Sequence, residues 1–265
     1  MDLAEAFSEI TGTEIIPTLN FRENPRWGVF QEKNTIEVSR RFRKCLKTKG
    51  VLFVNEEDNM LSNREFDLWA DGYDMSVGMS DDDGTYPFAG YKQILNEIYK
   101  RVLTSKCSTI LDIGFGTGTL TTKLYEQGCC IWGQDFSGRM IELAKAKMPE
   151  AKLYQGDFSK GLVEELRHNR YDTIIATYSL HHLSDEQKIT LIKSILPLLQ
   201  EGGCFYIGDV AFETRKELER CKILIGEEWD DEEFYFVVDE LTEVFPKMKY
   251  EKLSFCAGLL SLKND

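Results

Sequence analysis

The segment that most constrains the fold of this chain runs from Thr109 to Leu120, where an apolar stretch meets three alternating glycines. Thr109 to Ile113 has the length and composition of a short buried strand, and the apolar spacing after Gly118 predicts a helix. Glycine permits a tight turn and a close approach of the backbone to a ligand, and a helix start exposes N–H groups toward polar or anionic ligand parts. The segment therefore predicts a strand, loop and helix that bind a nucleotide-containing cofactor.

The spacing of the glycines narrows the choice of cofactor. Gly114, Gly116 and Gly118 follow a GxGxG pattern, whereas dinucleotide binders typically show GxGxxG. Asp112 precedes the first glycine while still on the strand. A carboxylate there contributes little to binding a pyrophosphate, but it pairs directly with a ligand that carries an ammonium group. A nicotinamide-dependent oxidoreductase is therefore the weaker alternative.

Two further aspartates follow predicted strands. Asp135 comes after the strand predicted over residues 129–132, at a position where a carboxylate can accept hydrogen bonds from both ribose hydroxyls. Asp157 ends the strand predicted over residues 152–154, where it can accept from an exocyclic adenine amine while Phe158 offers an apolar surface. The alternative for Asp157 is the capping of a helix or turn.

Strands and helices alternate along most of the chain. We predict helices over residues 91–103, after Gly118, and over 138–147, 186–199, 214–225 and 232–245, and strands over 109–113, 129–132, 152–154, 171–176, 204–209, 250–255 and 258–262. The alternation predicts an α/β fold: a Rossmann-like, doubly wound, seven-stranded sheet, mostly parallel with an antiparallel C-terminal strand and helices on both faces. Ligands bind such sheets at the carboxyl ends of the strands.

Residues 1–60 differ from the remainder of the chain. They show weak periodicity, a patch rich in Pro, Asn and Arg, and a basic stretch from Arg40 to Lys49. We interpret residues 1–60 as an N-terminal extension that serves as a lid or an interaction element, and residues 61–265 as one α/β domain.

Composition disfavours several classes of partner. Asp and Glu number 45 against 32 Lys and Arg, and the resulting net charge of −13 repels nucleic acid. The sequence has neither a membrane-spanning apolar run nor a signal peptide at its start, so we expect a cytoplasmic protein. The 7 cysteines form no CxxC pair and only 3 histidines are present, so we expect reduced thiols and no metal site.

Residues 66–209 resemble class I S-adenosylmethionine-dependent methyltransferases in several motifs that occur in order. Residues 66–74 resemble the F-x-x-W-A-x-x-Y-D motif of small bacterial enzymes, and together with residues 176–183, Ala-Thr-Tyr-Ser-Leu-His-His-Leu, they resemble the YrrT-type group. The resemblance implies methyl transfer from S-adenosylmethionine to a small-molecule acceptor, with S-adenosylhomocysteine as the product. It implies cofactor contacts for Tyr73, Tyr91, Asp112, Gly114, Gly116, Gly118, Asp135, Asp157, Phe158 and Thr177. A catalytically silent protein that binds S-adenosylmethionine or a partner is the alternative.

Two adjacent histidines follow the fourth predicted strand, close to where the methyl group should emerge. Methyl transfer mainly requires positioning, but an acceptor that carries a proton can need a general base. We expect His181 to be that base and His182 to point to the other side, because neighbouring residues that leave a strand alternate. The alternative is that both histidines pack at the strand–helix junction. We interpret the acidic run from Glu227 to Glu233 as the solvated start of a helix, with a metal site as the weaker alternative.

Overall fold

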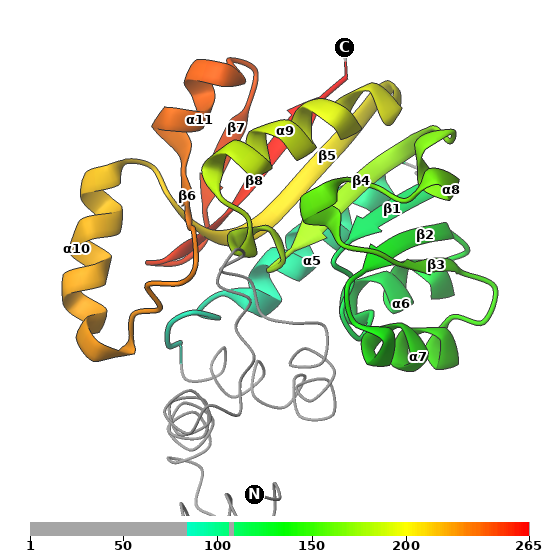
Figure 1. The fold of residues 1–265 in the computed structure, drawn as a ribbon, viewed down its shortest axis with the longest axis horizontal. Coiled ribbons are helices and arrows are strands. Elements are labelled where there is room, and N and C mark those ends of the chain that lie inside the picture. Colours follow the sequence, from blue (N-terminus) through cyan, green and yellow to red (C-terminus); the bar gives the residue numbers. More distant parts are fainter. Residues whose placement is uncertain (1–83, 106–108, 265) are drawn as a thin grey trace, which may run out of the picture. The chain divides into compact units, whose positions relative to one another are not determined.

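The computed structural model describes residues 84–105 and 109–264 (Figure 1). In chain order the elements are α5 (Tyr91–Thr104), β1 (Thr109–Ile113), α6 (Thr119–Glu126), β2 (Cys130–Asp135), α7 (Gly138–Lys147), β3 (Lys152–Gln155), η3 (Phe158–Lys160), α8 (Glu164–Arg167), β4 (Tyr171–Thr177), η4 (Leu180–His182), α9 (Asp185–Ile195), η5 (Leu196–Leu198), β5 (Leu199–Phe212), α10 (Arg215–Ile225), η6 (Gly226–Glu228), β6 (Phe236–Val237), α11 (Val238–Val244), β7 (Lys249–Lys252) and β8 (Ala257–Lys263). The predicted extension over residues 1–60, its boundary at residue 61 and Tyr73 lie outside the described residues.

The strands form one mixed sheet in the order β3-β2-β1-β4-β5-β8-β7. Strands β1 to β5 are parallel, whereas β8 is antiparallel to β5 and β7 is antiparallel to β8. The chain builds outward from β1 to β3 and then returns to place β4 on the other side of β1, which creates a switch point between β1 and β4. The predicted doubly wound fold is confirmed, with the short β6 as an additional strand beside the end of β5.

Helices cover both faces of the sheet (Figure 1). One buried apolar cluster joins the sheet to α5, α6 and α7, and includes Ile94 and Ile98 of α5. A second cluster joins it to α8, α9 and α11, and includes Leu191 and Ile192 of α9. Among the described residues, no helix has both the length and the apolar character that a membrane crossing requires.

The start of β5 differs from the prediction. We expected a helix to Leu199 and a break at the following glycines, but α9 ends at Ile195 and β5 begins at Leu199 and runs through both glycines. Pro197 lacks the N–H that a continuing helix needs. The glycine segment pairs instead with the chain end, since Gly202 N–H donates to the Asn264 carbonyl and Asn264 N–H donates to that of Gly203.

The segment after residue 231 also differs from the prediction. Only Val238–Val244 of the helix expected over residues 232–245 is helical. Phe236 and Val237 form β6 and pair with Ala211 and Phe212, because β5 extends beyond the end of its neighbour β4 and offers them an edge. This pairing brings the residues just before β6 to the carboxyl ends of β4 and β5.

Candidate active site

The glycine loop follows β1 and leads into α6. Gly114, Gly116 and Gly118 all have positive φ angles, of 70°, 55° and 78°, which side-chain-bearing residues rarely adopt. A Cβ on Gly114 would lie 2.4 Å from the Cβ of Ser179, so this glycine is required for packing. A Cβ on Gly116 would meet no described atom within 4 Å. The loop is therefore closed at its first glycine and open at its second, where a ligand can approach the backbone.

Asp112 lies at the base of this loop and is buried. Its Oδ2 accepts a hydrogen bond of 2.6 Å from the Thr121 hydroxyl, while its Oδ1 has no hydrogen-bond partner in the described part of the chain. Burial raises the pKa of Asp112 to about 7 against the opposing hydrogen bond from Thr121. An orphaned buried carboxylate oxygen suits a ligand cation, so the site fits the ammonium-bearing ligand that the sequence predicts.

Asp135 ends β2 and connects the glycine loop to the start of α7. Its Oδ2 accepts from Gly116 N–H at 2.8 Å and its Oδ1 accepts from Ser137 N–H at 2.9 Å. The carboxylate thus orders the open part of the loop. Contact between this carboxylate and ribose hydroxyls stays a prediction.

Asp157 is engaged as the N-cap of η3. Its Oδ1 accepts from the Ser159 N–H and hydroxyl at 3.0 and 2.5 Å, and its Oδ2 pairs with Lys160. Burial opposes the charge, but the contacts with Ser159 and Lys160 outweigh it and lower the pKa of Asp157. These contacts are the capping that we weighed as the alternative, and the adenine contact remains a prediction. Phe158 is buried beside Gly114.

Aromatic side chains gather at the carboxyl end of β4. The ring of Tyr178, the residue that follows this strand, lies 5.1 Å from that of Tyr91 and 5.3 Å from that of Phe88. Tyr178 has a φ of 49°, which turns the chain sharply after the strand. Thr177 is the last residue of β4 and pairs with Gly208 of β5. The fold therefore brings Tyr91 and Thr177 to the same strand end.

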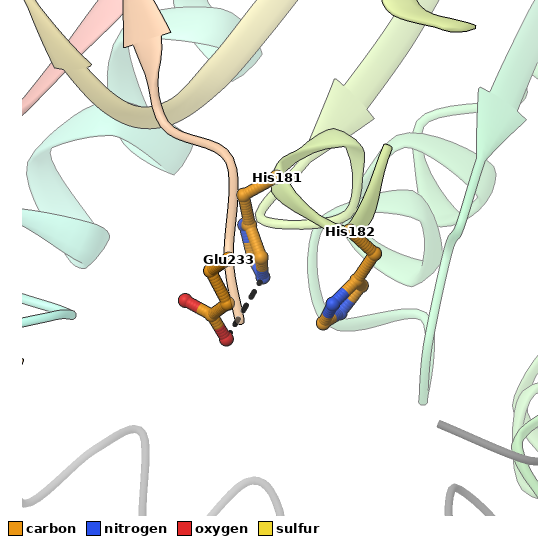
Figure 2. A group of neighbouring side chains, drawn as sticks. All are labelled: His181, His182 and Glu233. Atoms are coloured by element: carbon orange, nitrogen blue, oxygen red, sulfur yellow. Dashed lines mark ion pairs between the residues drawn. The ribbon is translucent and has the colours of Figure 1, made fainter. Parts of the chain in front are cut away.

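His181 and His182 lie in the η4 turn beyond this bend, and their rings are 4.2 Å apart between centroids. The Nδ1 of buried His181 contacts Asp209 Oδ1 at 2.7 Å, and its Nε2 lies 3.7 Å from Glu233 Oε1 (Figure 2). The expectation that the two rings diverge is wrong, because strand alternation does not continue into a 3₁₀ turn. The assignment of Glu233 to a solvated helix start is also wrong, since its side chain is 21% exposed and faces the histidine.

The cluster favours positive charge on the His181 ring. Burial opposes the charged ring, but Asp209 and Glu233 outweigh it and raise the pKa of His181 to about 9. Burial likewise opposes the charge of Glu233, and the two histidines and the Tyr235 hydroxyl nevertheless lower the pKa of this carboxyl. At neutral pH the ring therefore carries a proton and acts as a donor, so the predicted role as a general base requires an environment that draws this proton away.

Backbone contacts fix Glu233 opposite the histidines. The N–H of Phe234 donates to the His181 carbonyl at 2.8 Å, and the buried Lys188 ammonium donates to the Phe234 carbonyl. Lys188 is itself paired with Asp185 at 3.1 Å. Phe234, the residue that follows Glu233, is thus anchored to both η4 and α9.

The sequence patterns identified neither carboxylate of this cluster as a site residue. Asp209 lies near the end of β5, which is parallel to β4. Because parallel strands bring their carboxyl ends together, the position of Asp209 beside His181 could have been predicted. Glu233 gave no comparable signal, because it lies in an acidic run and reaches the site through the pairing of β6.

Comparisons with known proteins agree on one family. Residues 110–203 match the family model described as a methyltransferase domain. An uncharacterized methyltransferase of Geobacillus sp. (strain WCH70) is 36% identical over 188 residues, which cover 68% of this chain and 85% of the relative. An uncharacterized methyltransferase of Anoxybacillus flavithermus (strain DSM 21510 / WK1) is 37% identical over 154 residues, which cover 58% of this chain and 69% of the relative.

Solved structures resemble the fold at low sequence identity. The complex of DhpI with SAH has a TM-score of 0.56 at 16% identity and covers 76% of this chain and 93% of its own. Magnesium protoporphyrin IX methyltransferase from Synechocystis PCC 6803, with bound SAH, has a TM-score of 0.54 at 17% identity. The match covers 67% of this chain and 85% of the Synechocystis chain.

Proposed function

The chain belongs to the class I S-adenosylmethionine-dependent methyltransferases, and we propose that the acceptor of its methyl group is a small molecule. The observation that carries this proposal is the recessed position of the His181 cluster at the carboxyl end of β4, where the side chain of His181 is 8% exposed and that of Glu233 is 21% exposed. Side chains recessed in this way contact a small molecule more readily than a nucleic-acid duplex. The net charge of −13 also disfavours a polyanionic acceptor.

S-adenosylmethionine, when bound, supplies an electrophilic methyl group on a sulfonium sulfur. We assign its ammonium group to the orphaned oxygen of Asp112 and its methionine part to the open backbone at Gly116. Asp135 would accept from the ribose hydroxyls, and Asp157 and Phe158 would border the adenine. Tyr91 and Thr177 would close the cofactor site from the end of β4.

His181 is our proposed catalytic residue. Asp209 binds its Nδ1 and orients the ring so that Nε2 faces Glu233. A ring held at Nδ1 leaves Nε2 to contact an acceptor atom, and it can orient that atom for in-line attack with little loss of side-chain freedom. Once the ring has released its own proton to solvent, Nε2 can also take the proton of the acceptor.

The acceptor class is tested by separating a bacterial extract into a small-molecule filtrate and a macromolecular retentate. Each fraction is incubated with the full-length protein and S-adenosylmethionine, and S-adenosylhomocysteine is measured. We expect product with the filtrate. Product with the retentate alone would refute the small-molecule acceptor. Tight binding of S-adenosylhomocysteine without turnover in either fraction would favour the silent-binder alternative.

The role of His181 is tested with the variants His181→Ala and Asp209→Asn. Loss of an acid–base group costs about 10²-fold or more in turnover, and we expect His181→Ala to show that loss while S-adenosylhomocysteine affinity is retained. Asp209→Asn should lower turnover less, because the imidazole remains. Turnover per folded molecule that is unchanged in both variants would assign the pair to packing alone.

A further inference from the structure

We propose that His181, His182 and Glu233 bind one divalent transition-metal ion at the carboxyl end of β4. One ligand atom from each of the three side chains lies within 4.8 Å of the others. Both imidazoles extend from the η4 turn, and the carboxylate approaches from the segment that leads into β6 (Figure 2). Bonds of about 2.0–2.1 Å place tetrahedral ligand atoms about 3.4 Å apart. The 3.7 Å between His181 Nε2 and Glu233 Oε1 is close to that spacing.

The donor set determines which ion fits. Two imidazoles and one carboxylate are the ligands of catalytic zinc sites and of non-haem iron sites, in which at least one coordination position stays open. Magnesium and calcium prefer oxygen ligands, so they fit this cluster poorly. The set therefore indicates zinc, ferrous iron or another ion of similar ligand preference such as cobalt.

Each of two ligands has a partner that orients it. Asp209 contacts Nδ1 of His181 and so directs Nε2 toward the site, as in carboxylate–histidine–metal arrangements. The Tyr235 hydroxyl donates to Glu233 Oε2 at 2.6 Å and leaves Oε1 toward the histidines. The Tyr235 hydroxyl also contacts that of Tyr86, which accepts from the Asp230 N–H at 3.2 Å. These hydrogen-bonded contacts behind His181 and Glu233 distinguish the cluster from an isolated ion pair on the surface.

The local charge also suits a cation. Asp209 and Glu233 contribute two carboxylates beside one buried ring, and Asp209 Oδ2 has no hydrogen-bond partner in the described part of the chain. The opposing charge is that of Lys188, whose ammonium is engaged by Asp185 and the Phe234 carbonyl. The two positive charges of a bound ion would balance the carboxylates of Asp209 and Glu233.

Under the proposed function, the ion would serve the methyl acceptor. Its open position would bind an acceptor oxygen, nitrogen or sulfur and lower the pKa of that atom, which favours the nucleophilic form at neutral pH. The acceptor proton then passes to solvent, and no oxidant or reductant takes part. His181 would be a ligand in this state, and the metal would replace the ring in polarising the acceptor.

The test titrates the full-length, chelator-treated protein with Zn²⁺ and with Co²⁺ alone, by calorimetry and by visible absorption. We expect one ion per chain. His182→Ala and Glu233→Gln should each weaken binding at least about 10-fold, and Tyr235→Phe should weaken it by about 10-fold or more through the loss of a supporting contact.

The matched control is His168→Ala. His168 forms a pair of 2.6 Å with Glu164, but this pair is exposed and has no third ligand among the residues that the structure describes. The variant should therefore bind the ion as the unmodified protein does. Equal binding by His182→Ala and Glu233→Gln, or thiolate-to-cobalt absorption that indicates cysteine ligands, would overturn the site. S-adenosylhomocysteine affinity, measured on every variant without metal, separates failure of the metal site from failure of the cofactor site.

Discussion

At the scale of single residues, Asp112 and Asp135, the two carboxylates beside the glycine loop, differ in how their oxygens are hydrogen-bonded. Asp135 satisfies both oxygens with backbone N–H groups of its own chain. Asp112 is buried and its Oδ1 has no hydrogen-bond partner in the described part of the chain, so desolvation disfavours the charged carboxylate until a cation binds beside it. The first carboxylate therefore shapes the loop, and the second lowers the stability of the ligand-free protein at neutral pH.

We predict that Asp112→Asn stabilises the ligand-free protein at pH 8. The folded-state pKa of about 7 lies above the ordinary value of 3.8, so the folded form is disfavoured progressively as pH rises from about 4 through 7. This difference corresponds to at most about 4 kcal/mol at pH 8. Thermal unfolding at several pH values should show a gain in Tm for the variant that is full at pH 8 and shrinks toward pH 4. A gain independent of pH would contradict the buried charge.

We predict that Asp135→Asn weakens binding of S-adenosylhomocysteine by about 10-fold or more, since a charged acceptor near the ribose is worth about 1.5–3 kcal/mol. Calorimetric titration measures this loss. Asp172→Asn is the control, because Asp172 accepts two bonds of 2.8 Å from Thr109 at the opposite end of the parallel strands. It should lower stability and leave affinity unchanged. An equal loss of affinity in both variants would indicate a general effect of unfolding.

At the scale of elements, α5 packs directly on β5 because Gly208 has no side chain. A Cβ there would lie 2.3 Å from Ile94 Cγ2 and 3.3 Å from Ile98 Cδ1, and both isoleucines are fully buried. The close approach of helix and strand thus depends on one glycine.

We predict that Gly208→Ala lowers the free energy of unfolding by about 1–3 kcal/mol, the usual cost of overpacking a core. Urea unfolding of the cofactor-free protein measures it. Gly138→Ala is the matched control, since the nearest side-chain atom would be 3.6 Å from its Cβ. If Gly208→Ala unfolds at the same urea concentration as the unmodified protein, α5 does not pack on β5 in this way.

Sequence patterns located the elements whose boundaries are set locally. Gly138–Lys147 was predicted to the residue, because the apolar spacing lies within the segment and the capping Ser137 directly precedes it. The start of β5 and the whole of β6 escaped prediction, because pairing with Asn264 and Phe212 decides them. The same reason applies at the site: the glycine loop is contiguous and was predicted, whereas Glu233 reaches His181 only through the fold.

At the scale of the whole molecule, all strands of the described sheet lie after residue 108. The proposed division places residues 1–60 outside the cofactor-binding domain. We predict that a chain starting at Ser62 folds cooperatively and binds S-adenosylhomocysteine with the affinity of the full-length protein, since it keeps Tyr73 and every described element. Circular dichroism melting and calorimetry test this. A molten or insoluble product would show that the extension belongs to the core.

The Phe234 amide, which donates to the His181 carbonyl, is a natural probe for isotope exchange in heavy water. Its proton exchanges only when the segment before β6 separates from the η4 turn, so its exchange rate measures that separation at a single backbone position. Phe234 is 40% exposed, so heavy water can reach the amide whenever this hydrogen bond opens. Any ligand that joins Glu233 to the histidines lengthens the lifetime of this one proton, and mass spectrometry can follow that change without knowledge of the methyl acceptor.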